Sequence, residues 1–523
     1  MKRNEEWSRE GEHRHQRRRI EEEEGVPPAL GAVEDDLERT FEIRRGVAGP
    51  TEAWSLEEAD FAAVADEFDA ALMVAEGRWV APRDVLALWT QKTRMDPLFA
   101  RENRRTGAYT AARDALFAAD VRGSRTFRNR AGDKLLEVLE ASGMARALAR
   151  PRPLLLFADV CGGPGAFSEV VFRRCAGRAA RVAGVGVTLR AASGGTADWY
   201  AALARDPRFR AVYGPGGRGD AYDPATLAAL DAALRAEDAR GAYAVLADGG
   251  FTVASDDRSV ENIQELYTAR LLLAELVAAA QSLRPGGHFV CKLFDTFSDF
   301  SASLLYCCTL LFDAVRVVKP ARSRTVNSER YLAASGFRAD AAPGGPRRWL
   351  VDHLRALHAR AFAAPQPRAP RALAPVARML ADDAFRRSLR HLNSTLVQRQ
   401  THALTAVLDH VDWSRVVPVP VPPNPQGPRF VLPPILLSLR DGNPSEGVSV
   451  SDSGSAPVSS SPAQKDAETD PAPSAPASDS DSSSSPQKGT VVASSSEERG
   501  SETETAPAPV TSTIERQPEQ AGE

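Results

Sequence analysis

The sequence predicts an α/β protein built on a mostly parallel sheet with helices on both faces. Two observations support this fold class. Several short apolar runs have the composition of strands that are covered on both faces, and helical patterns separate a number of them along the chain. The 523 residues are 43% hydrophobic and 26% charged, which is enough apolar material for a large core.

The expected elements follow one another in a regular order. The first strand is LLLFADV (154–160), a continuous apolar run closed by glycines. Further strands are expected at RVAGVGVTL (181–189), YAVLADGG (243–250), HFVCKLF (288–294) and VRVVKP (315–320). Helices are expected at SEVVFRRCAG (168–177), DPATLAALDAALRAE (223–237) and 260–287, which ends at Pro285-Gly286-Gly287. Sheets of this kind bind ligands at the carboxyl ends of their strands.

The two ends of the chain differ in composition from its centre. Residues 1–50 alternate basic and acidic runs, which predicts a charged, disordered arm. Residues 441–523 are rich in Ser, Pro and acidic residues with almost no aromatics, and such a segment cannot bury enough apolar area to offset its chain entropy. We therefore expect a disordered tail there and assign 51–440 to one domain with helical flanks.

The charge balance excludes a protein whose whole surface is basic. There are 65 Lys and Arg against 69 Asp and Glu, a formal net charge of −4, although a local basic groove remains compatible with these totals. No run reaches the roughly 18 apolar residues of a membrane span, and the first 25 residues have no apolar core of a secretory signal. The five cysteines lack the spacing of a zinc site. We therefore expect no membrane and no metal among the partners of this protein.

A glycine-rich loop, DVCGGPGAF (159–167), follows the first strand and precedes a helix. Its glycines let a ligand approach the backbone closely, and the start of the helix offers unpaired N–H groups. A P-loop would need a Lys-Ser/Thr ending, which is absent, and a dinucleotide fingerprint would need glycine in place of Ser168 and an acid near the end of the next strand. The remaining candidates are the first loop of an S-adenosylmethionine methyltransferase and a tight strand–helix turn without a ligand.

Four charged residues are expected close to this loop. Asp248 ends one strand and Lys292 lies inside another apolar strand, so both fall on the same edge of the sheet. Lysines are almost never fully buried unless paired, so a purely structural Lys–Asp pair is one alternative interpretation. Lys134 lies on a helical stretch before the first strand, and Glu329 stands at the start of a last strand. Two lysines and two acids beside a cofactor loop would form a proton-transfer site.

Eight sequence segments resemble those of a known family. They occur in order between about residue 100 and residue 337: NRAGDKL, FADVCGGPGAFSEVV, GVGVTL, YGPGGRGD, LADGGF, ENIQE, GGHFVCKLFDTFSDFS and KPARSRTVNSERY. The chain resembles the FtsJ-type ribose 2′-O-methyltransferases, which carry a Lys–Asp–Lys–Glu tetrad, and within that group it is most similar to the cap-specific mRNA enzymes. A weaker similarity to their helical end continues through residues 382–411. The resemblance implies a Rossmann-like methyltransferase fold with a mostly parallel seven-stranded sheet.

The same resemblance implies roles for individual residues. The catalytic tetrad would be Lys134, Asp248, Lys292 and Glu329. S-adenosylmethionine would be held by Asn129, Cys161, Gly162, Gly163, Pro164, Gly165, Ala166, Phe167, Asp220 and Ala221. Asn262 and Asn327 match positions that contact capped RNA. The family loop usually reads CAGPGG, so Gly162 and Ala166 exchange the small residues in this chain.

The implied reaction moves a methyl group from S-adenosylmethionine to the 2′-hydroxyl of the first transcribed nucleotide, which converts cap 0 to cap 1. The implied partner is the 7-methylguanosine-capped 5′ end of mRNA. Lys292 is the candidate general base, because burial, Lys134 and the sulfonium of the cofactor disfavour its charged form. Asp248 would orient Lys292, and arginines before the first strand, such as Arg113, together with Arg322 and Arg324 would neutralise phosphates.

Three other functions stay open at this point. The first is the same chemistry on ribosomal or transfer RNA, and the second is an inactive subunit that binds the cap or the RNA. The third, a small-molecule O-methyltransferase, offers no reason for two lysines at the strand ends. We expect the protein in the nucleus, with HRHQRRR (13–19) as a candidate address, or in the cytoplasm or a viral factory if a virus encodes it.

Overall fold

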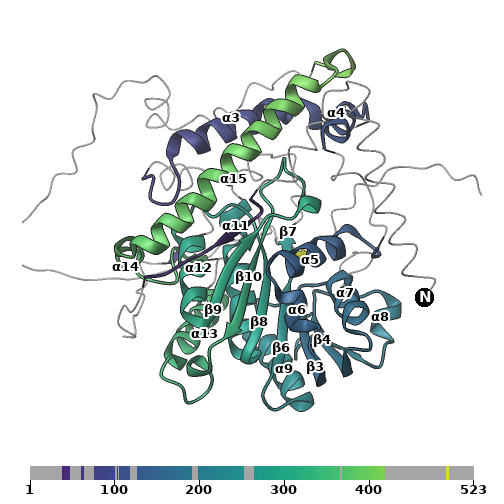
Figure 1. Cartoon of the computed structure of the whole chain (residues 1–523), viewed down its shortest axis with the longest axis vertical. Helices are drawn as coiled ribbons and strands as arrows, with labels where there is room; N and C mark the ends of the chain where they lie inside the picture. Colours follow the sequence, from purple (N-terminus) through teal and green to yellow (C-terminus); the bar gives the residue numbers. More distant parts are fainter. Residues whose placement is uncertain are drawn as a thin grey trace, which may run out of the picture.

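One eight-stranded sheet forms the centre of the protein (Figure 1). The computed structural model describes residues 38–46, 61–63, 76–100, 103, 105–117, 126–190, 198–251, 264–364, 368–418 and 491–493. The strand order is β1-β9-β10-β8-β6-β3-β4-β5. Their bounds are β1 (Thr40–Glu42), β3 (Arg152–Val160), β4 (Ala179–Val187), β5 (Phe209–Val212), β6 (Ala242–Ala247), β8 (Leu283–Leu293), β9 (Phe312–Val318) and β10 (Arg330–Phe337).

The mostly parallel sheet predicted from the sequence is confirmed. Strand β3 pairs in parallel with β4 and β6, β4 with β5, and β6 with β8. Strand β10 runs antiparallel between β8 and β9. Because β6 and β8 end at one edge of the sheet and the antiparallel β10 begins there, the residues at these three strand ends are neighbours. This edge also receives the loop that follows β3.

The structure adds two short strands near the ends of the chain to the predicted organisation. The sheet has eight strands rather than seven, because β1 pairs antiparallel with the outer strand β9, and β1 lies in the segment predicted as a disordered arm. Phe41 and Ile43 are buried on one side of this short strand, so the folded domain begins before residue 51. A strand of three residues in a charged segment is too short to show a periodic signal. Within the predicted tail, β12 (Val491–Ala493) pairs with β7 (Gly249–Phe251); the rest of 441–523 lies outside the described residues.

Helices cover both faces of the sheet, as predicted. One face carries α5 (Arg130–Ala141), α6 (Met144–Leu148), α7 (Ala166–Cys175) and α8 (Ala201–Ala204). The other carries α9 (Pro224–Glu237), α11 (Gln264–Ser282), α12 (Asp299–Leu311) and α13 (Arg348–Ala363). Alternate residues of β3 divide between the two layers: Leu155 and Phe157 pack with the first group, and Leu156 and Ala158 pack with the second. This burial on both sides explains the continuous apolar run in the sequence.

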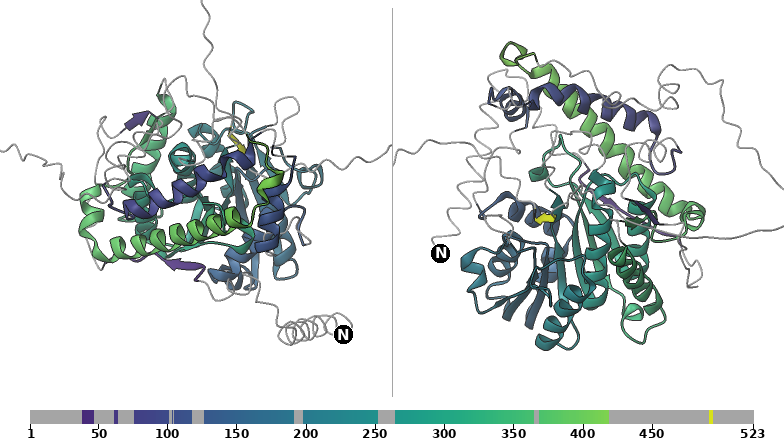
Figure 2. Two further views of the ribbon diagram at one scale, coloured as in Figure 1. Left: turned by 90° about the horizontal axis from the view of Figure 1, so that it is seen from above. Right: turned by 180° about the vertical axis from the view of Figure 1, so that it is seen from behind.

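A third apolar cluster joins helices that are far apart in the sequence. Helices α3 (Pro82–Phe99) and α4 (Ala108–Leu116) pack against the long α15 (Asp383–His410), with Leu88 and Trp89 among the buried residues on one side and Leu404 and Val407 on the other. Figures 1 and 2 show α3 and α15 side by side across the end of the sheet at which β10 begins. The remaining elements are β2 (Phe61–Ala63), which pairs with β11 (Arg368–Pro370), α14 (Val376–Ala381), and the short 3₁₀ turns Ala321–Ser323, Ala339–Ala341 and Trp413–Arg415.

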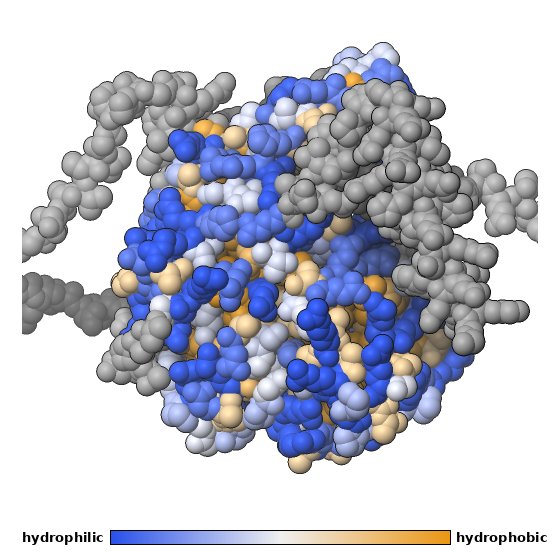
Figure 3. Space-filling model, in the orientation of Figure 1, coloured by the Kyte–Doolittle hydropathy of each residue, from blue (hydrophilic) through white to orange (hydrophobic). Residues whose placement is uncertain are grey.

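The described part of the face drawn in Figure 3 is mainly hydrophilic, with hydrophobic residues in small groups. In the described ranges no helix combines the length and hydropathy of a bilayer span. The same ranges contain no group of three or more His, Cys, Asp or Glu side chains arranged to hold a metal ion.

Candidate active site

The four charged residues predicted as a tetrad lie together at the edge of the sheet. Lys134 comes from α5, Asp248 directly follows β6, Lys292 lies near the end of β8, and Glu329 directly precedes β10. Lys292 Nζ is 3.0 Å from the main-chain oxygen of Asp248 and 3.4 Å from its carboxylate Oδ1. Lys134 Nζ lies 2.6 and 2.9 Å from the two carboxylate oxygens of Glu329. The tetrad therefore consists of two Lys–acid pairs.

Tyr331 joins the two pairs, and sequence reasoning missed it. Its hydroxyl lies 3.2 Å from Asp248 Oδ1 and 3.3 Å from Glu329 Oε1. Tyr331 is opposite Lys292 in the β10–β8 register and has no exposed surface. The available signal was its position two residues after Glu329 in a strand, since residues i and i+2 share one face.

Burial and the lysines act in opposite directions on the two carboxylates. Burial raises the pKa of Asp248 above its usual value, although Lys292 and Lys134 oppose the shift. Burial would also raise the pKa of Glu329, but the charges of Lys134 and Lys292 outweigh it and hold that pKa below its usual value. Lys292 is only 1% exposed, so water contributes little to the solvation of its amine, and Asp248 supplies two of its polar contacts.

Lys319, which follows β9, holds the chain segment that carries Glu329. Its ammonium group donates to the main-chain oxygens of Asn327 and Glu329, at 2.7 and 2.8 Å, and to Asn327 Oδ1 at 2.9 Å. The same Oδ1 accepts the Glu329 N–H at 3.2 Å. Asn327 was predicted to contact RNA, and that contact stays a prediction. Its side-chain Oδ1 makes these internal hydrogen bonds, which leaves the amide Nδ2 to donate to a ligand. Asn262, the other residue predicted to contact RNA, lies outside the described residues.

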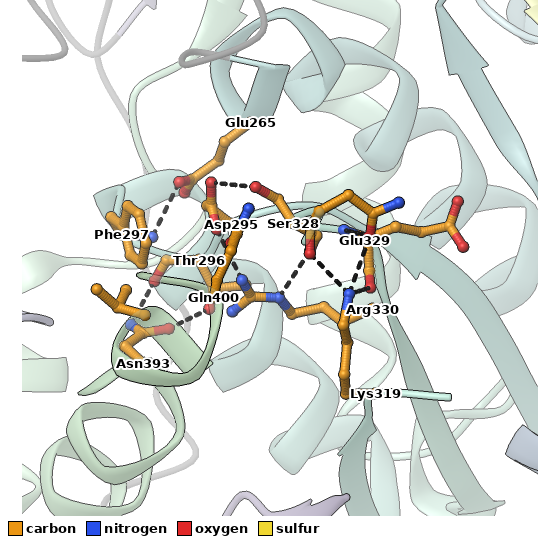
Figure 4. Close-up of polar contacts among 12 residues, drawn as sticks. Glu265, Asp295, Thr296, Phe297, Lys319, Ser328, Glu329, Arg330, Asn393 and Gln400 are labelled. Atoms are coloured by element: carbon orange, nitrogen blue, oxygen red, sulfur yellow. Dashed lines mark hydrogen bonds and ion pairs between the residues drawn. The ribbon is translucent and has the colours of Figure 1, made fainter. Parts of the chain in front are cut away.

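A buried ion pair anchors the next residue, Arg330. Its guanidinium donates to Asp295 Oδ1 at 2.7 Å and to the main-chain oxygen of Ser328 at 3.1 Å (Figure 4). Ser328 in turn donates its hydroxyl to Asp295 Oδ2 at 2.8 Å, and Lys92 of α3 lies 3.7 Å from the same oxygen. These contacts fix the residues on both sides of Glu329.

Helix α15 is tied to the same edge by two amide side chains, which Figure 4 shows beside the loop that follows β8. Asn393 Nδ2 donates to the Thr296 main-chain oxygen at 2.7 Å, and its Oδ1 accepts the Thr296 hydroxyl at 2.5 Å. Gln400 Nε2 donates to the Val326 main-chain oxygen at 3.1 Å. The α3–α15 pair therefore has a fixed position relative to the segment 326–330.

The glycine-rich loop has the backbone conformation expected of a loop that holds a ligand. Cys161 has φ of 55° and Gly165 has φ of 115°, and Gly165 is the N-cap of α7. The Gly163 N–H donates to Thr188 Oγ1 at 3.3 Å, which ties the loop to the end of β4. A Cβ on Gly162 would lie 1.7 Å from Asp159 Oδ1, so the alanine of the usual family loop would require Asp159 to turn. Ala166 and Phe167 are buried under the loop and serve to pack it.

The other residues predicted to hold the cofactor surround this loop. Asn129 Oδ1 accepts the Ala131 N–H at 3.0 Å and so caps α5, while its Nδ2 donates to the Tyr200 hydroxyl at 3.3 Å. Asp220 Oδ1 accepts the Tyr222 N–H at 2.9 Å, and Ala221 is buried beside it. These contacts place both residues by hydrogen bonds to the backbone.

Asp159 supplies an observation that fits a cofactor with a positive group. It is fully buried, and burial raises its pKa to about 7 despite hydrogen bonds from Ser168. Its Oδ2 accepts the Ser168 N–H at 3.0 Å and the Ser168 hydroxyl at 2.5 Å. No donor within the described ranges bonds its Oδ1. Oδ1 lies against Gly162 inside the loop, so Asp159 would act on a ligand above the loop through its negative charge, which favours a cationic group such as a sulfonium.

A cavity of about 390 Å³ opens beside Glu329. Glu329 and Asn327 form one side of it, and Lys92, Asp96, Phe99 and Tyr109 from the helical layer form another. Phe99 and Tyr109 have their ring centroids 4.6 Å apart. A nucleotide-sized ligand in this cavity would therefore meet aromatic rings, cations and a member of the tetrad at once.

The prediction that Arg113 neutralises phosphate is wrong. Arg113 is fully buried, pairs with Asp114 at 2.6 Å and lies over the Tyr109 ring with its guanidinium carbon 5.5 Å from the centroid. Its buried position on α4 follows from the helical packing, which an arginine-rich sequence does not reveal. Trp89 and Phe127 are buried in the core.

Comparison with known proteins covers this whole site. Residues 127–337, which include all four charged residues, match the FtsJ-like methyltransferase family. Cap-specific mRNA (nucleoside-2′-O-)-methyltransferase 1 of Trypanosoma cruzi is 40% identical over 330 residues, covering 62% of this chain and 85% of that protein. The protein of the same name from Trypanosoma brucei brucei is 38% identical, covering 62% and 83%. The one from Danio rerio is 42% identical over 190 residues, covering 35% of this chain and 22% of that protein.

Proposed function

Because this chain belongs to the FtsJ-like methyltransferases, among the cap-specific mRNA (nucleoside-2′-O-)-methyltransferases, we propose that it methylates the first transcribed nucleotide of capped mRNA. The acceptor is the ribose 2′-hydroxyl, and the donor is S-adenosylmethionine. The observation that carries the proposal is the buried contact of Lys292 with Asp248, next to the Lys134–Glu329 pair and the glycine loop. A small-molecule methyltransferase would need no such second lysine pair.

S-adenosylmethionine supplies an electrophilic methyl group on a positively charged sulfur. The residues that would hold it are the loop Cys161–Phe167, Asn129 and the Asp220–Ala221 turn, with Asp159 below the loop. The geometry of the glycine loop excludes larger side chains from this place, since a Cβ on Gly165 would lie 2.3 Å from Leu203.

A ribose hydroxyl is a poor nucleophile at neutral pH, so the protein must align it and remove its proton. In this proposal Lys292 Nζ, as a neutral amine, accepts the proton. The Asp248 main-chain oxygen and carboxylate, at 3.0 and 3.4 Å, hold the amine in one orientation. Lys134 and Glu329 position the ribose, and the Tyr331 hydroxyl keeps the two acids at a fixed separation.

The cavity beside Glu329 is the proposed site for the capped end of the RNA. Proteins that read single-stranded RNA stack bases on aromatic rings, and the Phe99–Tyr109 pair offers such a surface. Lys92 and Arg324, which also line the cavity, carry the charge that phosphates require. A nucleotide bound there reaches the tetrad through Glu329.

The test is methyl transfer from labelled S-adenosylmethionine to capped and uncapped transcripts of one sequence, followed by mapping of the modified ribose. We expect 2′-O-methylation of the first nucleotide of the capped transcript. Lys292→Ala and Asp248→Ala should each lower turnover by orders of magnitude while the protein still binds capped RNA. Near-normal turnover of either variant would contradict the assigned roles.

The transcript comparison also separates this function from its nearest rival, methylation of ribosomal or transfer RNA. Equal methylation of capped and uncapped RNA would favour the rival. Failure to bind S-adenosylmethionine in calorimetry would instead favour an inactive RNA-binding subunit. For the location we propose the nucleus, supported by the basic run HRHQRRR (13–19), and a fluorescent fusion with that run replaced by alanines tests it.

A further inference from the structure

Glu275 of α11 is a buried carboxylate that contacts the peptide unit joining Asp248 to Gly249. Glu275 Oε1 accepts the Gly249 N–H at 3.0 Å. The carbonyl of the same peptide accepts the hydrogen bond from Lys292 Nζ, also at 3.0 Å. The N–H and C=O of a planar trans peptide point in opposite directions. Glu275 and Lys292 therefore hold this one peptide from its two sides.

Contacts around Glu275 fix its own orientation. Its second oxygen, Oε2, accepts the thiol hydrogen of Cys291 at 3.2 Å, and Cys291 immediately precedes Lys292 on β8. Burial raises the pKa of Glu275 to about 7, although the bond from Cys291 and the charge of Lys292 oppose the shift. A Cβ on Gly249 would lie 2.3 Å from Glu275 Oε1, so only glycine permits this close approach.

Packing alone does not explain a carboxylate at this position. Glu275 has no exposed surface and lies in the apolar run LLLAELVAAA (271–280) of a helix that packs in the core. Placing an acid there costs desolvation free energy that a leucine would not. Its hydrogen bonds lead to Gly249 and Cys291, each the chain neighbour of a tetrad member.

We infer that Glu275 is a positioning residue for methyl transfer. It fixes the Asp248–Gly249 peptide so that the carbonyl holds Lys292 Nζ and the Asp248 carboxylate keeps its place. This inference rests on the proposed function, because it concerns the rate of that reaction. Glu275 touches no reacting atom, so its loss should lower kcat and leave substrate binding intact.

The test compares Glu275→Leu with Glu275→Gln. Leucine fills the same space without an acceptor, whereas glutamine retains an Oε1 that can accept the Gly249 N–H. We expect Glu275→Leu to lower kcat at least tenfold with KM for capped RNA and for S-adenosylmethionine within twofold of the wild type. Glu275→Gln should keep kcat within threefold. Val277→Ala, a cavity-forming change on the same helix, controls for a loss of stability and should leave kcat unchanged.

A second readout is independent of activity: hydrogen exchange of the Gly249 amide. We expect protection in the wild type and in Glu275→Gln, and exchange at least tenfold faster in Glu275→Leu. A kcat within threefold of wild type for Glu275→Leu, an equal loss in both variants, or unchanged Gly249 exchange in Glu275→Leu would each overturn the inference. If the wild type methylates no capped RNA, the proposed function fails, while the exchange measurement still decides whether Glu275 fixes the peptide.

Discussion

Replacing Tyr331 by phenylalanine removes one buried oxygen from the centre of the site and keeps the ring. The ring packs near Phe167, at 6.3 Å between centroids, so the core around it should be preserved. The change leaves Asp248 and Glu329 without the hydroxyl that lies between them. The expected effect is therefore on the separation of the two Lys–acid pairs.

The size of the effect follows from the geometry. The two oxygen–oxygen distances, 3.2 and 3.3 Å, exceed the usual 2.7 to 2.8 Å of an O–H···O bond, and one O–H serves one acceptor at a time. We therefore assign the hydroxyl about 1 to 2 kcal/mol, which lies around the lower end of the range of about 1.5 to 3 kcal/mol for a bond to a charged group. At about 1.4 kcal/mol per tenfold change, kcat should fall about 5- to 30-fold. Because Tyr331 has no exposed surface, KM for RNA should stay within about twofold.

The assay measures kcat and KM with capped RNA for Tyr331→Phe and for a matched control, Tyr243→Phe. Tyr243 lies near the start of β6, at the opposite edge of the sheet from Asp248, and its hydroxyl has a similar 3.2 Å contact with His288 Nε2. The control should keep wild-type kcat. A Tyr331→Phe enzyme with kcat within twofold of wild type, or one whose defect lies in KM alone, would refute this account of Tyr331.

Three further predictions concern stability and cofactor binding. Arg330→Met removes the main cationic partner of Asp295, where the paired side chains are 2% and 6% exposed. Asp295 keeps the Ser328 hydroxyl and Lys92 at 3.7 Å, so urea unfolding should show a loss of at most about 3 to 5 kcal/mol, and adding Asp295→Leu should recover part of it. Burial raises the pKa of Glu265 from 4.5 to about 7. The free energy of unfolding should therefore fall by at most about 3 kcal/mol as the pH rises from 4.5 to about 7, because the unfolded chain ionises this group first. Glu265→Gln should flatten this pH dependence of the unfolding free energy. Gly219→Ala would place a Cβ 1.9 Å from the Thr188 main-chain oxygen, so calorimetry should show S-adenosylmethionine binding weakened at least tenfold. Gly216→Ala, with open space around it, should bind normally.

The fold could be predicted because its central strands are buried on both faces. Such strands appear as continuous apolar runs, and β3, β4, β6, β8 and β9 were all found in this way. Strand β5, with the sequence FRAV, is four residues long and is interrupted by an arginine, so it shows no continuous apolar run. Strand β1 is shorter still, and only its pairing with β9 explains why Phe41 is buried.

From the sequence, only the site residues at strand ends could be placed relative to one another. The positions of Asp248 and Lys292 at the ends of two parallel strands placed them on one edge of the sheet. The β10–β8 register and the directions of the side chains determine two further features. They pair Lys134 with Glu329, and they place Tyr331 between the two Lys–acid pairs. Lys319 could not be assigned for the same reason, because its three acceptors are backbone and side-chain oxygens of a turn.

Helix α11 carries two buried acids, and each accepts hydrogen bonds from the backbone of a loop near the site. Glu265 accepts the N–H groups of Phe297 and Ser298, in the loop after β8, at 2.9 and 2.7 Å, while Glu275 accepts that of Gly249 after β6. The two acids are ten residues apart, about 15 Å along a helix, so one element holds the loops at two neighbouring strand ends. Burial raises the pKa of both acids to about 7, which shows that each is in a place unfavourable to its charge. Each acid therefore costs desolvation free energy, which its hydrogen bonds to backbone N–H groups offset. Their backbone partners lie beside Asp248 and at the start of α12, so the spacing along α11 helps to set the distance between the tetrad and the loop that contacts α15.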